Sequence, residues 1–243
     1  RKPKVLVIST PKGKRGLFYE MYLRGVAQEK GFREITATIY DDKLVTEEEI
    51  EDIKKRVSPM AFEEEFMVKF LDSSVTFFRG YENVFSDYVY NENVKQWIGI
   101  DLSANGEDAT IVTKVNELMQ VKQYKVEGTL DSKYKQIADI INSTRNLQMS
   151  YLEINGIGAV MLNEIQKLVY NKSKLREWTT TNQTKEKAVS TLAMAIANKE
   201  IHFNNEDKEL FSELGTFVVK YTKTGHIQFE ALSGHHDDRI LSL

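Results

Sequence analysis

The feature that most constrains the fold is the order of short apolar segments between residues 97 and 154. Two of the turns between these segments contain Asn105-Gly106 and Asn116-Glu117, which suit tight reversals of the chain. The pattern predicts three successive strands: Trp97–Asp101, Ala109–Asn116 and Met119–Val126. Strands joined by such short turns pair as an antiparallel meander. The centre of the chain is therefore expected to form a sheet and not a helical bundle.

The elements after the meander extend this sheet. Tyr134, Ile137, Ile140 and Ile141 recur at helical spacing and predict a helix over about 131–145. Gln148–Ile154 predicts another strand. A meander, a helix and then a parallel strand is the ribonuclease-H-like order, in which the first and fourth strands are neighbours. We therefore predict an α/β fold with a ribonuclease-H-like mixed sheet flanked by helices.

The remaining C-terminal sequence supplies further elements around that sheet. Asn155-Gly-Ile-Gly turns the fourth strand into a helix that runs through about Tyr170. The later pattern predicts a strand at Leu175–Trp178, helices at about 185–198 and 205–214, a hairpin over 217–231 and a last helix that begins near Asp237-Asp238.

Acidic side chains fall where this topology brings chain segments together. Asp101 ends the first strand, Glu153 ends the parallel strand beside it, and the last helix can present Asp237 or Asp238 to the same point. Two Mg²⁺ or Mn²⁺ ions about 3.5–4 Å apart stabilise the attacking and leaving oxygens in phosphodiester hydrolysis. Carboxylates are the ligands that such ions prefer. We predict that all four bind metal and catalyse, with Asp101 bridging the ions and Asp108 in a supporting role.

Each of these residues also has a simpler interpretation. An aspartate at the end of a strand is most often a turn or capping residue, and Asp237-Asp238 could be ordinary acidic residues at a helix N-terminus. Glu153 follows Tyr-Leu and is expected near burial, where an unpartnered carboxylate is costly. The three positions together favour a metal site more than each does alone, because one fold needs carboxylates at all of them.

The N-terminal part has a different pattern. Val5–Ile8 is a continuous apolar run that predicts a buried parallel strand, and Glu34–Tyr40 alternates as a strand would. Helices are expected from about Leu17, after the Thr46 N-cap, and from Ser58-Pro59. We predict three parts: a partial α/β segment over 1–72, a linker over 73–94 packed against another part, and the ribonuclease-H-like domain over 95–243.

Composition limits the class of protein. The 243 residues contain no cysteine, which excludes disulfides and thiolate zinc sites. No apolar run approaches the length of a membrane span, and no signal peptide is visible. The chain begins at Arg1 without a methionine, and we expect a fragment of a longer protein. The net charge of −3 is unusual for a DNA-binding protein, but bound cations reverse the local sign of an acidic site.

Local groups of basic residues could contact DNA phosphates. Surface clusters of this kind are often only solvated faces. The candidates for DNA contact are Lys172, Lys174, Arg176, Lys185, Lys187 and Lys223.

The motifs resemble those of one known family. Ile98-Gly-Ile-Asp-Leu-Ser with Asp108-Ala-Thr, Tyr151-Leu-Glu-Ile-Asn-Gly-Ile-Gly and His236-Asp-Asp-Arg resemble the nuclease motifs of the large terminase subunit of tailed bacteriophages. Thr179-Thr-Thr with Lys185 is similar to a further recurring stretch of that family. Single motifs are short, and their order and spacing together are more specific.

The resemblance extends to the N-terminal part. Val5-Leu-Val-Ile-Ser-Thr-Pro-Lys-Gly with Phe18-Tyr19 resembles the last coupling motif of the family's packaging ATPase. The segment from Pro59 to Phe70 is similar to the part that leads from the ATPase to the nuclease. By this resemblance, 1–72 is the end of an ATPase domain, and Ser9, Thr10 and Pro11 couple nucleotide state to DNA movement. No Walker motif matches, so no ATPase activity is expected from this chain alone.

The resemblance implies a metal-dependent endonuclease that cuts concatemeric double-stranded DNA during genome packaging. It also implies the portal protein and the small terminase subunit as partners of the full-length protein, and the host cytoplasm during virion assembly as the location. This chain itself is expected to be monomeric and not bound to a membrane. Two alternatives remain: another ribonuclease-H-like phosphotransferase, such as a junction resolvase or transposase, and a catalytically silent module that binds DNA or a partner.

Overall fold

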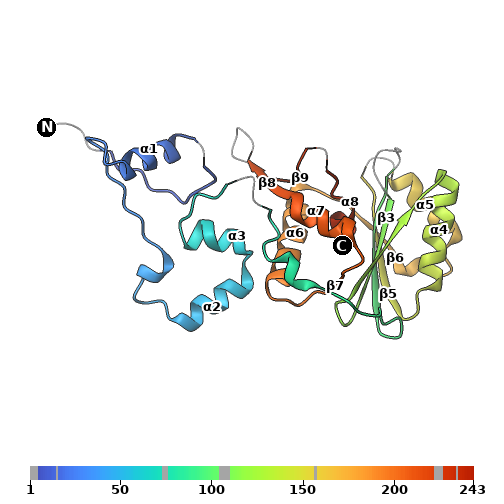
Figure 1. Cartoon of the computed structure of the whole chain (residues 1–243). Helices are drawn as coiled ribbons and strands as arrows, with labels where there is room; N and C mark the ends of the chain where they lie inside the picture. Colours follow the sequence, from blue (N-terminus) through green and yellow to red (C-terminus); the bar gives the residue numbers. More distant parts are fainter. Residues whose placement is uncertain are drawn as a thin grey trace.

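The structure is a computed structural model that describes residues 5–14, 16–72, 76–103, 110–155, 158–221, 227–233 and 235–243. Figure 1 shows the N-terminal helices at one end of the molecule and the large sheet at the other, with α6, α7 and α8 between them. None of the described helices is long and apolar enough to cross a lipid bilayer.

The large sheet has five strands in the order β4-β3-β2-β5-β6. Strand β2 pairs antiparallel with β3 and parallel with β5, so it lies at the centre. The bounds are β2 Gln96–Asp101, β3 Thr110–Asn116, β4 Val121–Val126, β5 Leu147–Glu153 and β6 Leu175–Trp178. The predicted meander and the predicted parallel strand beside Trp97–Asp101 are both confirmed.

Helices cover one face of this sheet through an apolar core. Helix α4 (Leu130–Ser143) and helix α5 (Gly158–Leu168) pack against each other on that face, to the right of the sheet in Figure 1. The alternation in β2 points Ile98 and Ile100 into this core, where both are almost completely buried. The opposite face carries Trp97, Gly99 and Asp101, which are only partly covered.

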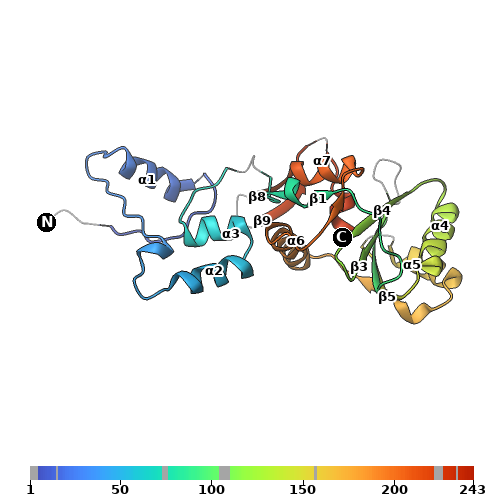
Figure 2. The same cartoon turned by 60° about the horizontal axis from the view of Figure 1, so that its bottom comes forward.

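A second apolar core is formed by the elements on the side of the sheet away from α4 and α5. Its helices are α6 (Asn182–Ala197) and α7 (Lys208–Thr216), and Figure 2 shows both on the side of the sheet away from α4 and α5. Its other elements are the strand pair β1 (Phe85–Ser86) and β7 (Phe203–Asn204), the hairpin β8 (Phe217–Tyr221) and β9 (Ile227–Ala231), and α8 (Asp238–Leu241).

The segment predicted as a packed linker contributes to this second core. Phe77 and Phe78 are buried, and the backbone N–H of Phe77 donates to the carbonyl of Phe217 at 2.8 Å. A little further on, Arg79 forms an ion pair with Glu63 at 2.8 Å. The chain between the N-terminal helices and the sheet is thus held at several points, by apolar burial and by an ion pair.

The N-terminal helices begin where their capping residues predict. Helix α2 (Glu47–Arg56) begins after Thr46, which forms a reciprocal capping box with Glu49. Ser58 caps α3 (Pro59–Ala61), which continues as a π-helix over Phe62–Phe66. The remaining short elements are α1 Gly16–Val26 and the 3₁₀ turns Ile39–Asp41, Tyr81–Val84 and Lys172–Lys174.

Two predicted strands are wrong. Val5–Ile8 and Glu34–Tyr40 pair with no strand among the residues that the structure describes, and the second segment ends in a 3₁₀ turn. Their apolar side chains are exposed, with Leu6 at 80% and Ile35 at 81%. An apolar run becomes a strand only where a neighbouring strand completes its hydrogen bonds and another layer buries its side chains.

Candidate functional site

The site is built first from the ends of two parallel strands. Asp101 is the last residue of β2 and Glu153 the last of β5, and the pairing of Ile100 with Leu152 brings the two ends level. Because side chains alternate along a strand, both carboxylates lie on the face opposite to α4 and α5. The backbone pairing alone therefore brings these two acidic side chains together.

The third contribution comes from the short helix α8. Asp237 is its N-cap and Asp238 its first residue, so both side chains lie at the start of the helix. Its last turn rests on the sheet: the hydroxyl groups of Ser242 and Thr113 are hydrogen-bonded at 2.5 Å in a buried position. A Cβ atom at Gly99 would lie 2.0 Å from the carbonyl oxygen of Ser242, so only glycine allows this approach.

A buried arginine holds the start of α8. The Arg239 guanidinium donates to Asp207 Oδ2 at 3.2 Å and to Gln123 Oε1 at 3.1 Å, and it also pairs with Glu209. Glu213 accepts the backbone N–H of Arg239 at 2.9 Å, and burial raises the pKa of Glu213 to about 7. These contacts fix the helix that carries the two aspartates.

Sequence reasoning gave no role to Gly99, Glu213 or Arg239. A glycine in the middle of a predicted central strand is a signal for a close approach of backbone, and it could have indicated the first. Arg239 belongs to the quoted His236-Asp-Asp-Arg motif, but nothing local indicates the partners of Arg239 or Glu213, because these lie far away in the sequence.

The carboxyl group of Asp101 interacts electrostatically with the other three predicted carboxylates. The pKa of Asp101 is raised to about 8, first by burial and then by the negative charges of Glu153, Asp238 and Asp237. A hydrogen bond between the carboxyl groups of Asp101 and Glu153 adds to the effect. A bound cation would relieve both the repulsion and the cost of burial.

One predicted basic residue lies at the same point. Lys185, in the first turns of α6, places its Nζ 3.1 Å from Asp237 Oδ2, and about a fifth of each side chain is exposed. The same ammonium group lies 5.8 Å from the centre of the Phe217 ring. Lys185 therefore neutralises part of the acidic cluster.

The donor chemistry fits hard divalent cations, because four carboxylates supply only oxygen ligands. Among the described residues, however, no group of three or more His, Cys, Asp or Glu side chains is arranged so that it could hold an ion as it stands. Asp237 is engaged by Lys185 in this arrangement. Among the described residues, the carboxylates that interact with Asp101 are therefore the candidate ligands.

The other predicted DNA-contact residues are more scattered. Lys172 and Lys174 precede β6 and lie at the opposite end of that strand from Trp178, which pairs with Glu153. Arg176 lies within β6, between Lys174 and Trp178, and Lys187 is exposed on α6. The structure does not bring Lys172 and Lys174 to the carboxylates. Asp108 and Lys223 lie outside the described residues.

The predicted coupling residues are remote from the carboxylates. Ser9 and Thr10 are exposed and Pro11 is buried, in the N-terminal part at the far end of the molecule in Figure 1. The loop is tied to the π-helix, because the backbone N–H of Gly13 donates to Glu64 Oε1 at 3.2 Å.

No protein-family model and no curated protein sequence matches the chain. Solved structures do match its fold. The large terminase nuclease from thermophilic phage G20c has a TM-score of 0.58 at 16% identity, over 69% of this chain and 95% of that one. A second structure of that nuclease contains bound magnesium and matches with a TM-score of 0.58 at 17% identity, over 69% of this chain and 94% of that one.

A longer match includes the N-terminal part. The large terminase from another thermophilic bacteriophage matches with a TM-score of 0.64 at 14% identity, over 96% of this chain. This chain spans 59% of that terminase. The predicted ribonuclease-H-like fold is confirmed by these likenesses.

Proposed function

We propose that the chain is a divalent-metal-dependent DNA endonuclease that belongs to the large subunit of a phage packaging terminase. The observation that carries this proposal is the convergence of Asp101, Glu153, Asp237 and Asp238 at one edge of the sheet. The fold supports it, because solved terminase nucleases with this fold include forms with bound cobalt and magnesium.

In this proposal the carboxylates bind the metal ions and Lys185 contacts the DNA. Asp101, Glu153 and the aspartates of α8 would hold two Mg²⁺ or Mn²⁺ ions, which supply charge neutralisation and an activated water for phosphodiester hydrolysis. Asp101 is the proposed bridging ligand, since it ends the central strand and its pKa is raised first by burial and then by the charges of the other three. Lys185 holds Asp237 when the protein is free of metal and offers a positive charge to a DNA phosphate.

The proposal for the whole protein is wider than this chain. We propose that 1–72 is the end of a packaging ATPase, 73–94 a linker and 95–243 the nuclease, with Ser9, Thr10 and Pro11 in coupling. The full-length protein would act on concatemeric double-stranded DNA in the host cytoplasm during virion assembly. Its proposed partners are the portal protein and the small terminase subunit.

Removal of divalent cations tests the proposed activity directly. We expect supercoiled plasmid to be nicked and linearised in Mn²⁺ or Mg²⁺, and to stay intact in excess EDTA, because the carboxylate cluster repels a phosphate unless cations neutralise it. Gel electrophoresis of plasmid over time measures this. Cleavage that persists in EDTA would exclude a metal-dependent mechanism.

The same preparation separates the alternatives. A rate on four-way junctions well above the rate on linear duplex would favour a junction resolvase. Absence of both cleavage and Mn²⁺ binding by calorimetry at millimolar concentration would favour a silent binding module.

Lys185→Gln is expected to change metal and DNA binding in opposite directions. Loss of the ammonium 3.1 Å from Asp237 Oδ2 frees that carboxylate, so Mn²⁺ should bind about fivefold more tightly, which corresponds to about 1 kcal/mol. DNA affinity should fall, because one contact to phosphate is lost. Isothermal titration with Mn²⁺ and filter binding with duplex DNA measure the two effects.

Lys187→Gln is the matched control for Lys185→Gln, because Lys187 lies two residues further on in the same helix and is exposed. It should leave Mn²⁺ affinity unchanged. Equal effects of the two substitutions on Mn²⁺ binding would contradict the role of the Lys185–Asp237 pair.

A further inference from the structure

An open cavity of about 660 Å³ is lined in part by Glu153, one of the four carboxylates. Strands β2, β3, β5 and β6 contribute residues to its lining, together with the turn after β3, α6 and the end of the chain after α8. Three aromatic side chains line it, and each keeps about two fifths of its surface exposed: Trp97, Tyr151 and Trp178. Of the four carboxylates, Glu153 is part of the same lining, so the cavity meets the acidic cluster at this residue.

The sheet register explains why these rings gather there. Gly99 pairs with Tyr151, and Glu153 pairs with Trp178, so all of them lie on the face opposite to α4 and α5. The rings of Tyr151 and Trp178 meet edge to face, with centroids 6.5 Å apart. Large rings grouped around an open cavity, and not buried in the adjacent core, are typical of a binding site.

The distances to the acidic cluster suit neighbouring nucleotides. Paired residues on adjacent strands are about 5 Å apart, and residues two apart along one strand are about 7 Å apart. Trp178 is the paired neighbour of Glu153, and Tyr151 precedes Glu153 by two residues. A phosphate at the carboxylates therefore places the base of the same or the next nucleotide at these rings.

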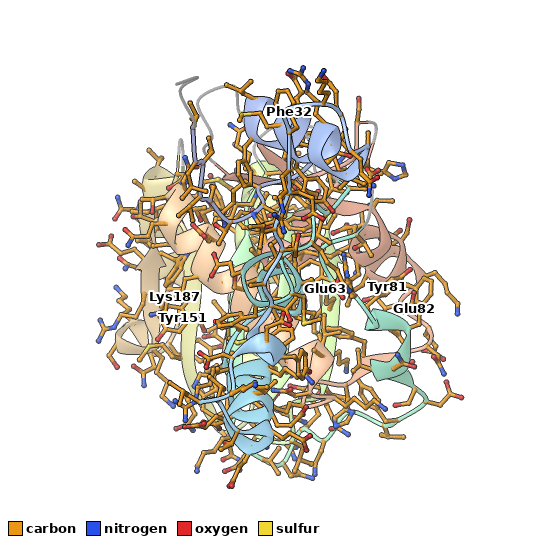
Figure 3. All side chains as sticks on the ribbon, turned by 90° about the vertical axis from the view of Figure 1, so that its left-hand side faces the viewer. Phe32, Glu63, Tyr81, Glu82, Tyr151 and Lys187 are labelled. Carbon is orange, nitrogen blue, oxygen red and sulfur yellow. The ribbon has the colours of Figure 1, made fainter. Side chains whose placement is uncertain are left out.

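The charged residues of the described lining are Glu117 and Glu153, and basic residues lie close to lining residues in the sheet and on α6. Arg176 pairs with Tyr151 in the sheet and lies on the same face. On α6, Lys187 directly precedes Ala188 of the lining and Lys185 lies three residues before it, and Figure 3 shows Lys187 and Tyr151 on the same side of the view. Glu117 is the acidic residue at the far end, and Lys95 pairs with it at 3.0 Å. Arg176, Lys185 and Lys187 are therefore near enough to contact the phosphates of a polyanion whose planar groups enter the cavity.

We propose that this cavity binds an unpaired nucleobase of the DNA strand, next to the phosphate that is cut. Only a base outside the double helix offers a free face to an aromatic side chain, and such stacking is tolerant of sequence. The inference rests on the proposed function and deepens it, because it assigns the enzyme a substrate that is locally opened at the cleavage point. The DNA would therefore need a frayed, mismatched or single-stranded position at the cleavage point.

The chain provides its own reporter for this binding. It contains two tryptophans, Trp97 and Trp178, and both line the cavity. The experiment uses the Asp101→Asn chain in Mg²⁺, so that the DNA is not cut. Three probes are compared: an oligothymidine of about eight nucleotides, an abasic oligonucleotide of the same length, and a blunt duplex.

We expect the oligothymidine to quench tryptophan fluorescence and to bind about tenfold more tightly than the abasic strand, as expected for one stacked base. Tyr151→Ala should reduce this preference, and Tyr151→Phe should keep it because the ring remains. Equal affinity for the thymidine and abasic strands, without a change in fluorescence, would overturn the proposal.

This outcome is distinguishable from failure of the proposed function. Metal-dependent plasmid cleavage by the unmodified chain, together with base-independent binding, would remove the nucleobase site alone. Base-dependent quenching without any cleavage would support the cavity and remove the nuclease proposal.

Discussion

Replacement of Asp101 with alanine should lower the rate of plasmid cleavage at least about 10³-fold, which corresponds to about 4 kcal/mol in the activation barrier. Asp101 ends the central strand, and its pKa is raised to about 8 first by burial and then by the charges of Glu153, Asp238 and Asp237. Loss of this side chain removes the proposed bridging ligand from the centre of the cluster. Initial rates of plasmid nicking in Mn²⁺ measure the effect.

Asp101→Asn separates loss of chemistry from loss of structure. The pKa of Asp101 is higher in the folded protein than its unfolded value of about 3.9, so the metal-free protein should lose stability as pH rises from about 4 to about 8. Asparagine carries no charge at this position. The variant in EDTA should therefore melt at the same or a higher temperature than the unmodified chain at pH 9, and differ little at pH 4. A folded Asp101→Ala chain that cuts at the normal rate would disprove the site.

The second large effect is expected from Gly99→Ala. The new Cβ would lie 2.0 Å from the carbonyl oxygen of Ser242, so α8 has to move away from β2. Overpacking of this kind typically costs about 1–3 kcal/mol in the free energy of unfolding. A displacement of about 1 Å in α8 also moves Asp237 and Asp238, and misplacement by that distance can lower a rate about 10²-fold. Chemical denaturation and plasmid nicking measure the two consequences.

Gly215→Ala is the matched control for Gly99→Ala. Its Cβ would meet the hydroxyl of Tyr81 at 2.8 Å, which is the end of a side chain that can rotate away. Gly215 lies near the end of α7, and its substitution should leave cleavage nearly unchanged. If the Gly99→Ala protein cuts DNA as fast as the Gly215→Ala protein, the close contact between the end of α8 and β2 does not position the site.

Local patterns were sufficient to predict the central sheet. The segments around Trp97–Asp101 and Gln148–Ile154 have the composition of buried strands, and the residues between them allow one topology among few. That topology brings Asp101 and Glu153 to one edge, as the strand pairing does in the structure. The Asp237-Asp238 pair could be predicted only as a candidate, because its approach depends on tertiary contacts of α8.

The contacts that complete the site could not be predicted from local sequence. Lys185 meets Asp237, and Arg239 meets Asp207 and Gln123, across separations of 52, 32 and 116 residues. For the apolar run Val5–Ile8, local sequence predicted a strand that the structure does not contain. Its composition is that of a strand, but strand formation depends on a partner that local sequence does not describe.

The distribution of the site along the chain has a consequence for synthesis. Asp101 and Glu153 belong to β2 and β5, whereas Asp237 and Asp238 belong to α8, which follows the whole sheet in the order of translation. A nascent chain that has formed the sheet still lacks two of its four carboxylates. The proposed cleavage would therefore begin only after α8 has left the ribosome and docked, and incomplete products of translation should be inactive on DNA.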